Sequence, residues 1–271
     1  MFLSALRKPV DTFAPSLGYL YRRLRDAGVA QRSRQTIYGF RLAGDARMAS
    51  SSFEPDEIRI FLELLKSHDT VLDIGANVGF YTCLAASRRK HVVSFEPSPR
   101  NLNFLYRNLW ENRLSCAEVF PVGLGGRCGL GRFYGFGGIS SFVPGWAQAK
   151  VSKYTLVPVT TLDAVVAKRF AGQRLLIKMD VEGFELDVLA GARETLSLDP
   201  KPTWLVEMLL RNAIIPGGTN SRFRETFEVF WTCGYGCRKL AKCEIRVQKA
   251  DVERWVASGC ADCADFLFSS A

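Results

Sequence analysis

The feature that most constrains the fold is a regular alternation of short apolar runs with amphipathic segments, which begins at Thr70. Apolar runs at 70–74, 91–96, 117–122, 175–180 and 204–207 have the length of buried strands, and several of the segments between them show helical spacing. Strand–helix alternation is typical of a parallel sheet with helices on both faces. The sequence therefore predicts a doubly wound, mostly parallel α/β domain.

The chain of 271 residues is long enough for one such domain preceded by an extension. Apolar residues recur at helical spacing from Asp56 to Lys66, directly after Pro55. We therefore expect the domain to span 53–271 and residues 1–52 to form a basic N-terminal extension. Within this extension, the residues suit a helix at 16–27 and a strand at 36–40.

The extension carries most of the positive charge. Residues 1–50 hold nine Arg and Lys against three Asp, a surplus of six out of the chain's net charge of +9. A basic face attracts nucleic acid, anionic lipid or an acidic substrate, but a solvated helix face is the more common explanation. Peripheral membrane contact through this segment is left open, and the sequence does not fix an oligomeric state.

The eight cysteines lack the spacing of a disulfide framework, which indicates free thiols in a reducing compartment. Residues 1–9 are apolar over too short a stretch for a secretory signal and lack a small-residue cleavage site. No apolar run approaches the roughly 20 residues needed to cross a bilayer. We therefore expect a cytoplasmic protein. Among the C-terminal cysteines, only Cys260 and Cys263 have a zinc-like spacing, and we expect no metal site.

Acidic residues and glycines gather where the first two predicted strands end. Asp73 closes the first strand, Gly75, Asn77 and Gly79 form the turn into the next helix, and Glu96 ends the second strand. In open parallel sheets, ligands bind beyond the carboxyl ends of the strands. Glycines there let a ligand lie close to the main chain, and a carboxylate such as Glu96 can accept both hydroxyl hydrogens of a ribose.

Two classes of cofactor bind at a turn of this kind. A nicotinamide dinucleotide requires Gly-x-Gly-x-x-Gly, so that its pyrophosphate can rest on the helix N-terminus. Here Asn77 stands where that pattern needs a glycine. Asp73 would repel a pyrophosphate, whereas it would attract the ammonium and sulfonium groups of S-adenosylmethionine. The turn therefore favours S-adenosylmethionine.

A second acidic cluster follows the apolar strand that ends near Met179. Asp180 lies at the end of this strand, Glu182 and Glu185 lie in the loop that enters a helix, and Glu207 ends the next strand. Stabilisation of the first helical turn is an alternative explanation for Glu182 and Glu185. Several carboxylates that face one cleft repel one another, so some of their pKa values should rise into the range useful for a general base.

Together these motifs resemble the FkbM-type methyltransferase family. The similarity is carried in order by 71–79, 95–97, Asn101, Asn108, 161–163, 178–185, Glu207 and 234–235, and it covers roughly residues 36–240. The resemblance implies a Rossmann-like, mostly parallel seven-stranded sheet with a final antiparallel strand. It also implies S-adenosylmethionine as cofactor and O-methylation of a hydroxyl, often on a sugar or a natural product.

The resemblance further implies roles for single residues. The turn 75–79 would hold the methionine part of the cofactor, Glu96 with Pro97 the ribose, and Gly123 with its neighbours the adenine. The segment Ser140-Ser141 is similar to a Ser-Ser segment of the family. Its hydroxyls either reach the substrate cleft or belong to an ordinary hairpin loop.

Methyl transfer to a hydroxyl requires alignment of the reacting atoms and a base that takes the hydroxyl proton. We expect Asp180 or Glu182 to be this base and Glu207 to position the acceptor. His68 and His91 both precede strands. They should therefore lie at the opposite end of the sheet, away from the reaction.

Three functions fit these motifs. The leading one is O-methylation of a sugar, glycan or natural-product-like small molecule. The second is RNA ribose 2′-O-methylation, favoured by the basic N-terminus and by Asp180 with Glu207. The helix after Asp180 contains no lysine and no aromatic-basic RNA-binding module is evident, so nucleic acid is not the expected partner. The third is a non-catalytic binding domain, which the intact cofactor motifs disfavour.

Overall fold

The computed structural model describes residues 32–135, 139–166, 168–212, 214–240 and 245–270. The chain divides into two compact units, residues 1–53 and 54–271. The helix expected at 16–27 lies outside the described residues. The role of the first unit as a separate extension stays a prediction.

The described part of the first unit is a small hairpin. Strand β1 (Arg34–Gln35) pairs antiparallel with β2 (Arg41–Leu42). The strand expected at 36–40 is wrong, because these residues form the connection between the two strands. Thr36 Oγ1 donates a hydrogen bond to Phe40 O at 2.7 Å and closes this connection.

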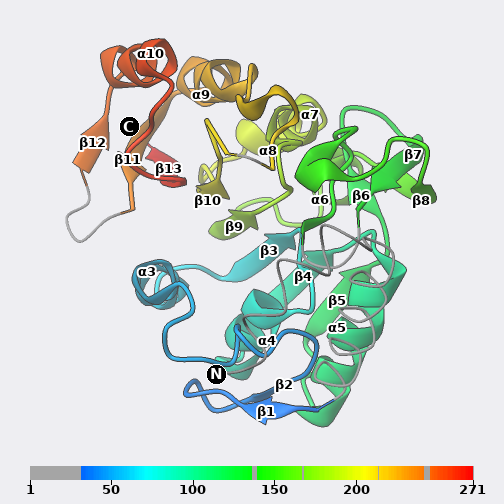
Figure 1. The fold of residues 1–271 in the computed structure, drawn as a ribbon. Helices are drawn as coiled ribbons and strands as arrows, with labels where there is room; N and C mark the ends of the chain where they lie inside the picture. Colours follow the sequence, from blue (N-terminus) through cyan, green and yellow to red (C-terminus); the bar gives the residue numbers. More distant parts are fainter. Residues whose placement is uncertain (1–31, 136–138, 167, 213, 241–244, 271) are drawn as a thin grey trace. The chain divides into compact units, whose positions relative to one another are not determined.

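The second unit is built on an eight-stranded sheet in the order β12-β11-β13-β10-β9-β3-β4-β5 (Figure 1). Its strands are β3 (Thr70–Ile74), β4 (His91–Phe95), β5 (Ala117–Phe120), β9 (Leu175–Met179), β10 (Thr203–Glu207), β11 (Tyr235–Lys239), β12 (Ile245–Val247) and β13 (Asp265–Ser270). Five neighbouring strands of this order, β10, β9, β3, β4 and β5, pair in parallel. Strands β13, β11 and β12 join them by antiparallel pairs. The predicted class, a mostly parallel Rossmann-like sheet that ends on an antiparallel strand, is confirmed.

The outer part of the sheet differs in detail from the expectation of seven strands. The order contains those seven strands and adds the short β12, which pairs with β11 alone at the edge. After β12, helix α10 (Lys249–Ser258) returns the chain, so that β13 inserts between β10 and β11. The hairpin of β11 and β12 is thereby displaced to the edge of the sheet.

Helices follow the strands as the alternation predicts. They are α3 (Pro55–Leu65), α4 (Phe80–Ser87), α5 (Pro99–Glu111), α6 (Leu162–Val166), α7 (Glu185–Ala190), α8 (Arg193–Leu196) and α9 (Phe223–Thr232). In Figure 1, α4 and α5 lie on one side of the parallel strands, and α6 to α9 lie on the other. The helix expected after Asp180 is interrupted between α7 and α8, where Gly191 packs so closely that an added Cβ would lie 2.2 Å from Gly125 O.

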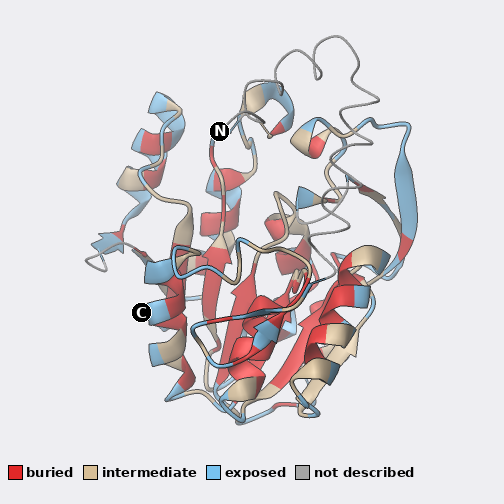
Figure 2. Ribbon diagram, turned by 60° about the horizontal axis from the view of Figure 1, so that its bottom comes forward, coloured by how far each residue is buried: buried red, intermediate tan, exposed pale blue. Residues whose placement is uncertain are grey.

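The core lies in the middle of this sheet. Figure 2 shows buried residues concentrated in the central strands. All five positions of β3 and all five of β9 are buried, as expected for parallel strands covered on both faces. On one side, Phe230 of α9 stacks on Phe268 of β13 with ring centroids 3.9 Å apart. The strand ends that carry the acidic residues are therefore held by a packed core.

A three-stranded sheet is inserted between β5 and β9. It contains β6 (Gly123–Leu124), β7 (Gly129–Tyr134) and β8 (Tyr154–Thr160) in the order β6-β8-β7. The connection from β7 to β8 carries the 3-10 helix η2 (Trp146–Gln148). We call residues 123–160 the insertion. Across the described ranges of both units, no helix is long and apolar enough to cross a membrane.

Candidate active site

The register of the parallel strands brings the motif residues together. Ile74 of β3 lies opposite the last residues of β4 and of β9. The residues that follow these strands, Gly75, Glu96 and Asp180, therefore meet at one edge of the sheet. Strand β10 continues the same register, so Glu207 lies next to Asp180.

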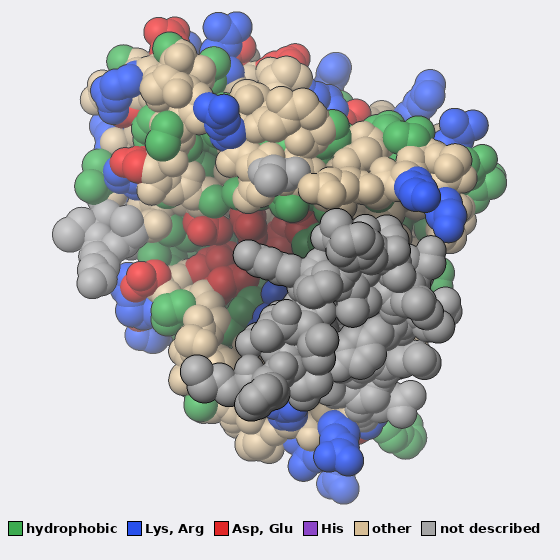
Figure 3. Space-filling view, viewed as in Figure 1, with side chains coloured by type: hydrophobic (Ala, Val, Ile, Leu, Met, Phe, Trp, Pro, Cys, Tyr) green, Lys and Arg blue, Asp and Glu red, His purple; other side chains and the backbone are tan. Residues whose placement is uncertain are grey.

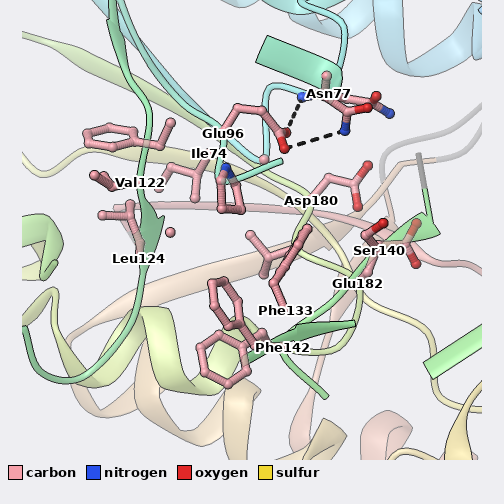
Figure 4. Close-up of a pocket in the computed structure, with 17 residues that line it drawn as sticks. Ile74, Asn77, Glu96, Val122, Leu124, Phe133, Ser140, Phe142, Asp180 and Glu182 are labelled. Carbon is pink, nitrogen blue, oxygen red and sulfur yellow. Dashed lines mark hydrogen bonds between the residues drawn. The ribbon is translucent and has the colours of Figure 1, made fainter. Parts of the chain in front are cut away.

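A cavity opens at this edge (Figure 4). Seven of the ten predicted site residues line it: Gly75, Asn77, Glu96, Pro97, Gly123, Asp180 and Glu182. The other lining residues are Ile74, Phe95, Asn101, Val122, Leu124, Phe133, Ser140, Phe142, Val181 and Phe184. An apolar wall with a few convergent polar groups is typical of a ligand site. Sequence reasoning did not identify the aromatic part of this wall, because the insertion supplies much of it.

Glu96 is held by the main chain around it (Figure 4). Its carboxyl group accepts hydrogen bonds from Asn77 N at 2.7 Å, Ser98 N at 2.7 Å and Asn101 Nδ2 at 3.4 Å. The residue is only 3% exposed, and burial raises its pKa to about 7. Because a carboxylate has about four acceptor positions, Glu96 keeps capacity for a ligand hydroxyl.

The turn after β3 depends on left-handed backbone. Gly75, Asn77 and Gly79 have φ angles of +83°, +53° and +88°. A Cβ on Gly75 would lie 1.9 Å from Asp180 O, and one on Gly79 would lie 2.2 Å from Leu105 Cδ1. The two glycines are therefore required for close packing of the turn against β9 and α5. Gly79 does not line the described cavity.

Asp73 is buried in the domain and does not line the described cavity. It is 2% exposed and accepts a hydrogen bond from Thr82 Oγ1 at 2.5 Å. Burial raises its pKa to about 6. An attraction between Asp73 and a cationic cofactor would therefore act over a distance and not by contact, and this role stays a prediction.

A buried lysine lies among the carboxylates at the ends of these strands. Lys178 Nζ lies 2.9 Å from Glu57 Oε1, and both side chains are almost fully buried. The neighbouring carboxyl groups are those of Glu57, Asp180, Glu207 and Asp265. Burial alone would lower the pKa of Lys178, but these groups raise it well above its usual value. Figure 3 shows acidic side chains gathered in a hollow on one face of the molecule.

Asp180 and Glu207 are hydrogen-bonded to each other. The charge of Asp180, followed by burial, raises the pKa of Glu207 to about 10. Burial also raises the pKa of Asp180. The charge of Asp180 and burial therefore favour the protonated form of Glu207. Glu207 does not line the described cavity, so its role in positioning the acceptor stays a prediction.

The two glutamates of the next loop have different surroundings. Glu182 lines the cavity, and burial together with the charge of Asp180 raises its pKa to about 8. Glu185 begins α7 and accepts a hydrogen bond from Gly183 N at 2.8 Å. Helix-terminal stabilisation, the alternative explanation from the sequence, therefore describes the contacts of Glu185 better than those of Glu182.

Trp146 is a site residue that sequence reasoning missed. Its Nε1 donates a hydrogen bond to Glu182 Oε2 at 2.9 Å. The two serines of the nearby Ser140-Ser141 segment have different surroundings. Ser140 lines the cavity, whereas Ser141 Oγ donates to Glu182 O at 2.7 Å. The similarity of the serine pair to the family was the one signal that pointed to this segment.

The histidines lie at the amino ends of the strands. His68 Nε2 contacts Thr203 Oγ1 at 2.9 Å where β10 begins, and His91 Nε2 lies 2.9 Å from Glu118 Oε1. Among the residues that the structure describes, no three His, Cys, Asp or Glu side chains are grouped as metal ligands. Cys243 lies outside these residues.

Comparisons with known proteins agree with the motif order. The family model described as methyltransferase FkbM domain matches residues 73–236. The hexuronic acid methyltransferase AglP of Haloferax volcanii is 32% identical over 149 residues, which are 53% of this chain and 58% of that protein. The match thus spans less than two thirds of the relative's length.

Two solved structures illustrate the more distant similarity. A TehB-like SAM-dependent methyltransferase from Corynebacterium glutamicum aligns with 12% identity and a TM-score of 0.43, over 93% of this chain and 97% of that chain. Fibrillarin from Aeropyrum pernix, in complex with S-adenosyl-L-methionine, aligns with 11% identity and a TM-score of 0.41, over 75% and 67%.

The family match covers more than half of the chain, and it begins at Asp73 and includes Glu96, Asp180 and Glu207. It confirms the predicted methyltransferase class, and S-adenosylmethionine is the cofactor of this class, as the turn after β3 indicated. The chain belongs to the FkbM methyltransferase family.

Proposed function

We propose that this chain transfers the methyl group of S-adenosylmethionine to a hydroxyl of a sugar, glycan or natural-product-like small molecule. The observation that carries the proposal is that Asp180 and Glu182 line the same cavity as Glu96. A hydroxyl that entered beside the cofactor would therefore meet a base. A relative named as a hexuronic acid methyltransferase supports the sugar class.

The wall of the cavity suits each part of the cofactor. Glu96 would accept a ribose hydroxyl at its remaining acceptor position. Val122, Leu124 and Phe142 offer an apolar surface for the adenine. Asp180 would attract the positively charged ammonium and sulfur groups. When bound, S-adenosylmethionine supplies a methyl group on a positively charged sulfur.

The residues of this chain then have two tasks, to orient the acceptor hydroxyl and to take its proton. Asp180 lines the cavity, and its carboxyl group is hydrogen-bonded to Glu207 and to the main chain of Glu182. Glu182 has a pKa of about 8, so it is a stronger base than an ordinary carboxylate. Either group would receive the hydroxyl proton when the methyl group passes from sulfur to the hydroxyl oxygen, which breaks the methyl–sulfur bond and leaves S-adenosylhomocysteine.

The test uses Asp180→Asn and Glu182→Gln, with Asp262→Asn on the surface as the matched control. S-Adenosylhomocysteine affinity is measured by calorimetry, and turnover is measured with methyl-labelled cofactor. Loss of the base should lower kcat by about 10²–10⁴-fold. S-Adenosylhomocysteine affinity should change little in Glu182→Gln but fall in Asp180→Asn, because Asp180 would also attract the ammonium group. If neither variant lowers turnover, neither carboxyl group is the base.

The acceptor class needs its own experiment. Labelled cofactor is incubated with the full chain and with neutral sugars, hexuronic acids, glycans from a cell extract, and RNA. Label in a sugar or glycan, stable to mild base as an ether, supports the proposal. Label in RNA alone would support ribose 2′-O-methylation instead, and its salt dependence would then be measured.

A further inference from the structure

We propose that Trp146 and Ser141 form a clamp that holds Glu182 in its working position at the cavity, and that Trp146 is a positioning residue for this carboxyl group. The inference rests on the proposed function, because it concerns the group that faces the acceptor. It adds residues of the insertion, which the motifs at the strand ends did not reveal.

The clamp contacts both the side chain and the main chain of Glu182. Trp146 Nε1 donates to the side chain of Glu182 at 2.9 Å, and Ser141 Oγ donates to its main-chain oxygen at 2.7 Å. Trp146 is 3% exposed and Ser141 is fully buried. A buried polar group that loses its partner carries a desolvation cost. Breaking either hydrogen bond would therefore be unfavourable.

The backbone of this loop explains why a clamp is required. Glu182 has a φ of +55°, a left-handed backbone conformation that residues other than glycine seldom adopt. Gly183 follows with a φ of +90°. A Cβ there would lie 2.4 Å from Trp146 Cζ3, so the indole ring packs directly on the main chain beside Glu182. The ring and its N–H group therefore fix the same loop by packing and by hydrogen bonding.

Trp146 is itself anchored to a second part of the site. Its main-chain N donates to Val143 O at 3.2 Å, and Ala147 N donates to Ile214 O at 2.6 Å. The segment around Ile214 follows β10, which ends on Glu207. The clamp thus connects the insertion to the loops that follow both β9 and β10, where the acidic residues lie.

The electrostatic surroundings define what the clamp does to Glu182. Burial raises the pKa of Glu182 most, the charges of Asp180 and Glu185 raise it further, and Lys178 lowers it. The hydrogen bond from Trp146 lowers it as well. The indole therefore favours the carboxylate form. Without the N–H donor, the pKa should rise above about 8, and less carboxylate would be present at neutral pH.

The first test does not depend on activity. Protonation of a carboxylate in contact with an indole changes its fluorescence, so wild-type emission should change with a midpoint near pH 8. We expect this transition to disappear in Trp146→Phe and in Glu182→Gln. It should persist in the control Trp110→Phe, since Trp110 is 85% exposed. A transition that persists unchanged in Trp146→Phe would overturn the proposal.

The second test is the pH profile of kcat. Trp146→Phe keeps an aromatic ring against Gly183 but removes the N–H group. Its acidic limb should move to higher pH, and a rise of the Glu182 pKa by one pH unit lowers turnover on that limb about tenfold. S-Adenosylhomocysteine affinity should stay within about threefold of wild type, since Trp146 does not line the described cavity. If Glu182→Gln lowers turnover, so that Glu182 is the base, a Trp146→Phe profile that superimposes on wild type would contradict the clamp.

The two tests separate the clamp from the proposed function. If the wild type transfers no methyl group to any acceptor, the proposed function fails. The fluorescence titration would still decide whether Trp146 controls the protonation of Glu182. If turnover is found but the fluorescence transition is absent from the wild type, the clamp fails and the proposed function stands.

Discussion

Glu96 combines burial with a task that requires charge. It is 3% exposed, and its oxygens accept hydrogen bonds from Asn77, Ser98 and Asn101. These donors favour the carboxylate, but burial outweighs them and raises the pKa to about 7. The group that would hold the ribose therefore changes its charge near neutral pH.

The affinity for S-adenosylhomocysteine should therefore depend on pH. Below a pKa of about 7 Glu96 is mostly neutral, and above it the carboxylate can accept a ribose hydroxyl at its remaining acceptor position. Affinity should rise from pH 6 to pH 8, by at most about tenfold for each pH unit below the pKa. Calorimetry on Glu96→Gln provides the control, which should bind more weakly and without this rise. A wild-type rise that Glu96→Gln retains would exclude Glu96 as its cause.

At the scale of elements, helix α3 and strand β9 are joined by a buried ion pair. Pro55 begins α3, and Glu57 in its first turn approaches Lys178 of β9 to 2.9 Å. Tyr81 of α4 donates a hydrogen bond at 2.7 Å to Glu54, the residue that precedes α3. Lys178 Nζ also lies 5.4 Å from the centre of the Tyr81 ring. Polar contacts thus connect three elements behind the acidic strand ends.

Removing one partner of this ion pair should lower the free energy of unfolding more than replacing both partners with apolar residues. Lys178→Met leaves Glu57 buried without its cation, and loss of one partner of a buried pair typically destabilises by about 3–5 kcal/mol. The double variant Lys178→Met/Glu57→Leu should recover part of that loss, because neither charge remains. Urea unfolding of wild type, both single variants and the double variant gives the coupling energy. A double variant no more stable than Lys178→Met would contradict this account.

At the scale of the whole molecule, several acidic groups of the second unit retain protons that an unfolded chain would release. The affected pKa values are about 8 for Glu54, about 8 for Glu182, about 10 for Glu207 and about 7 for Asp265. Burial is the largest cause for all of them except Glu207, where the charge of Asp180 comes first. These raised pKa values therefore lower the free energy of unfolding at alkaline pH.

Stability should accordingly fall between pH 7 and pH 8.5. In this range the folded chain binds more protons than the unfolded chain, because the folded pKa values are raised, so the free energy of unfolding decreases as pH rises. Each retained proton contributes about 1.4 kcal/mol per pH unit. Glu207→Gln has no proton to release on unfolding, so its slope should be smaller. Equal slopes for the two proteins, from urea unfolding, would be evidence against this origin.

Most of the parallel sheet and its ligand edge could be predicted from local patterns. The runs ending at Ile74, Phe95 and Met179 are apolar and short, and parallel strands end at a common edge. Gly75 and the acids Glu96 and Asp180 could therefore be assigned to one site. The packing of the insertion could not be predicted in this way, because β7 and β8 are mostly exposed and the contacts with Glu182 come from the segment between them.

The sequence by itself determined the class of sheet, the turn after β3 and the acids at the strand ends, because each is a local pattern of burial or backbone freedom. Only the tertiary structure decided that Asp73 is buried away from the cavity, that Lys178 pairs with Glu57, and that Trp146 holds Glu182. These contacts join segments far apart in the chain. Their partners are selected by packing, which no spacing along the chain encodes.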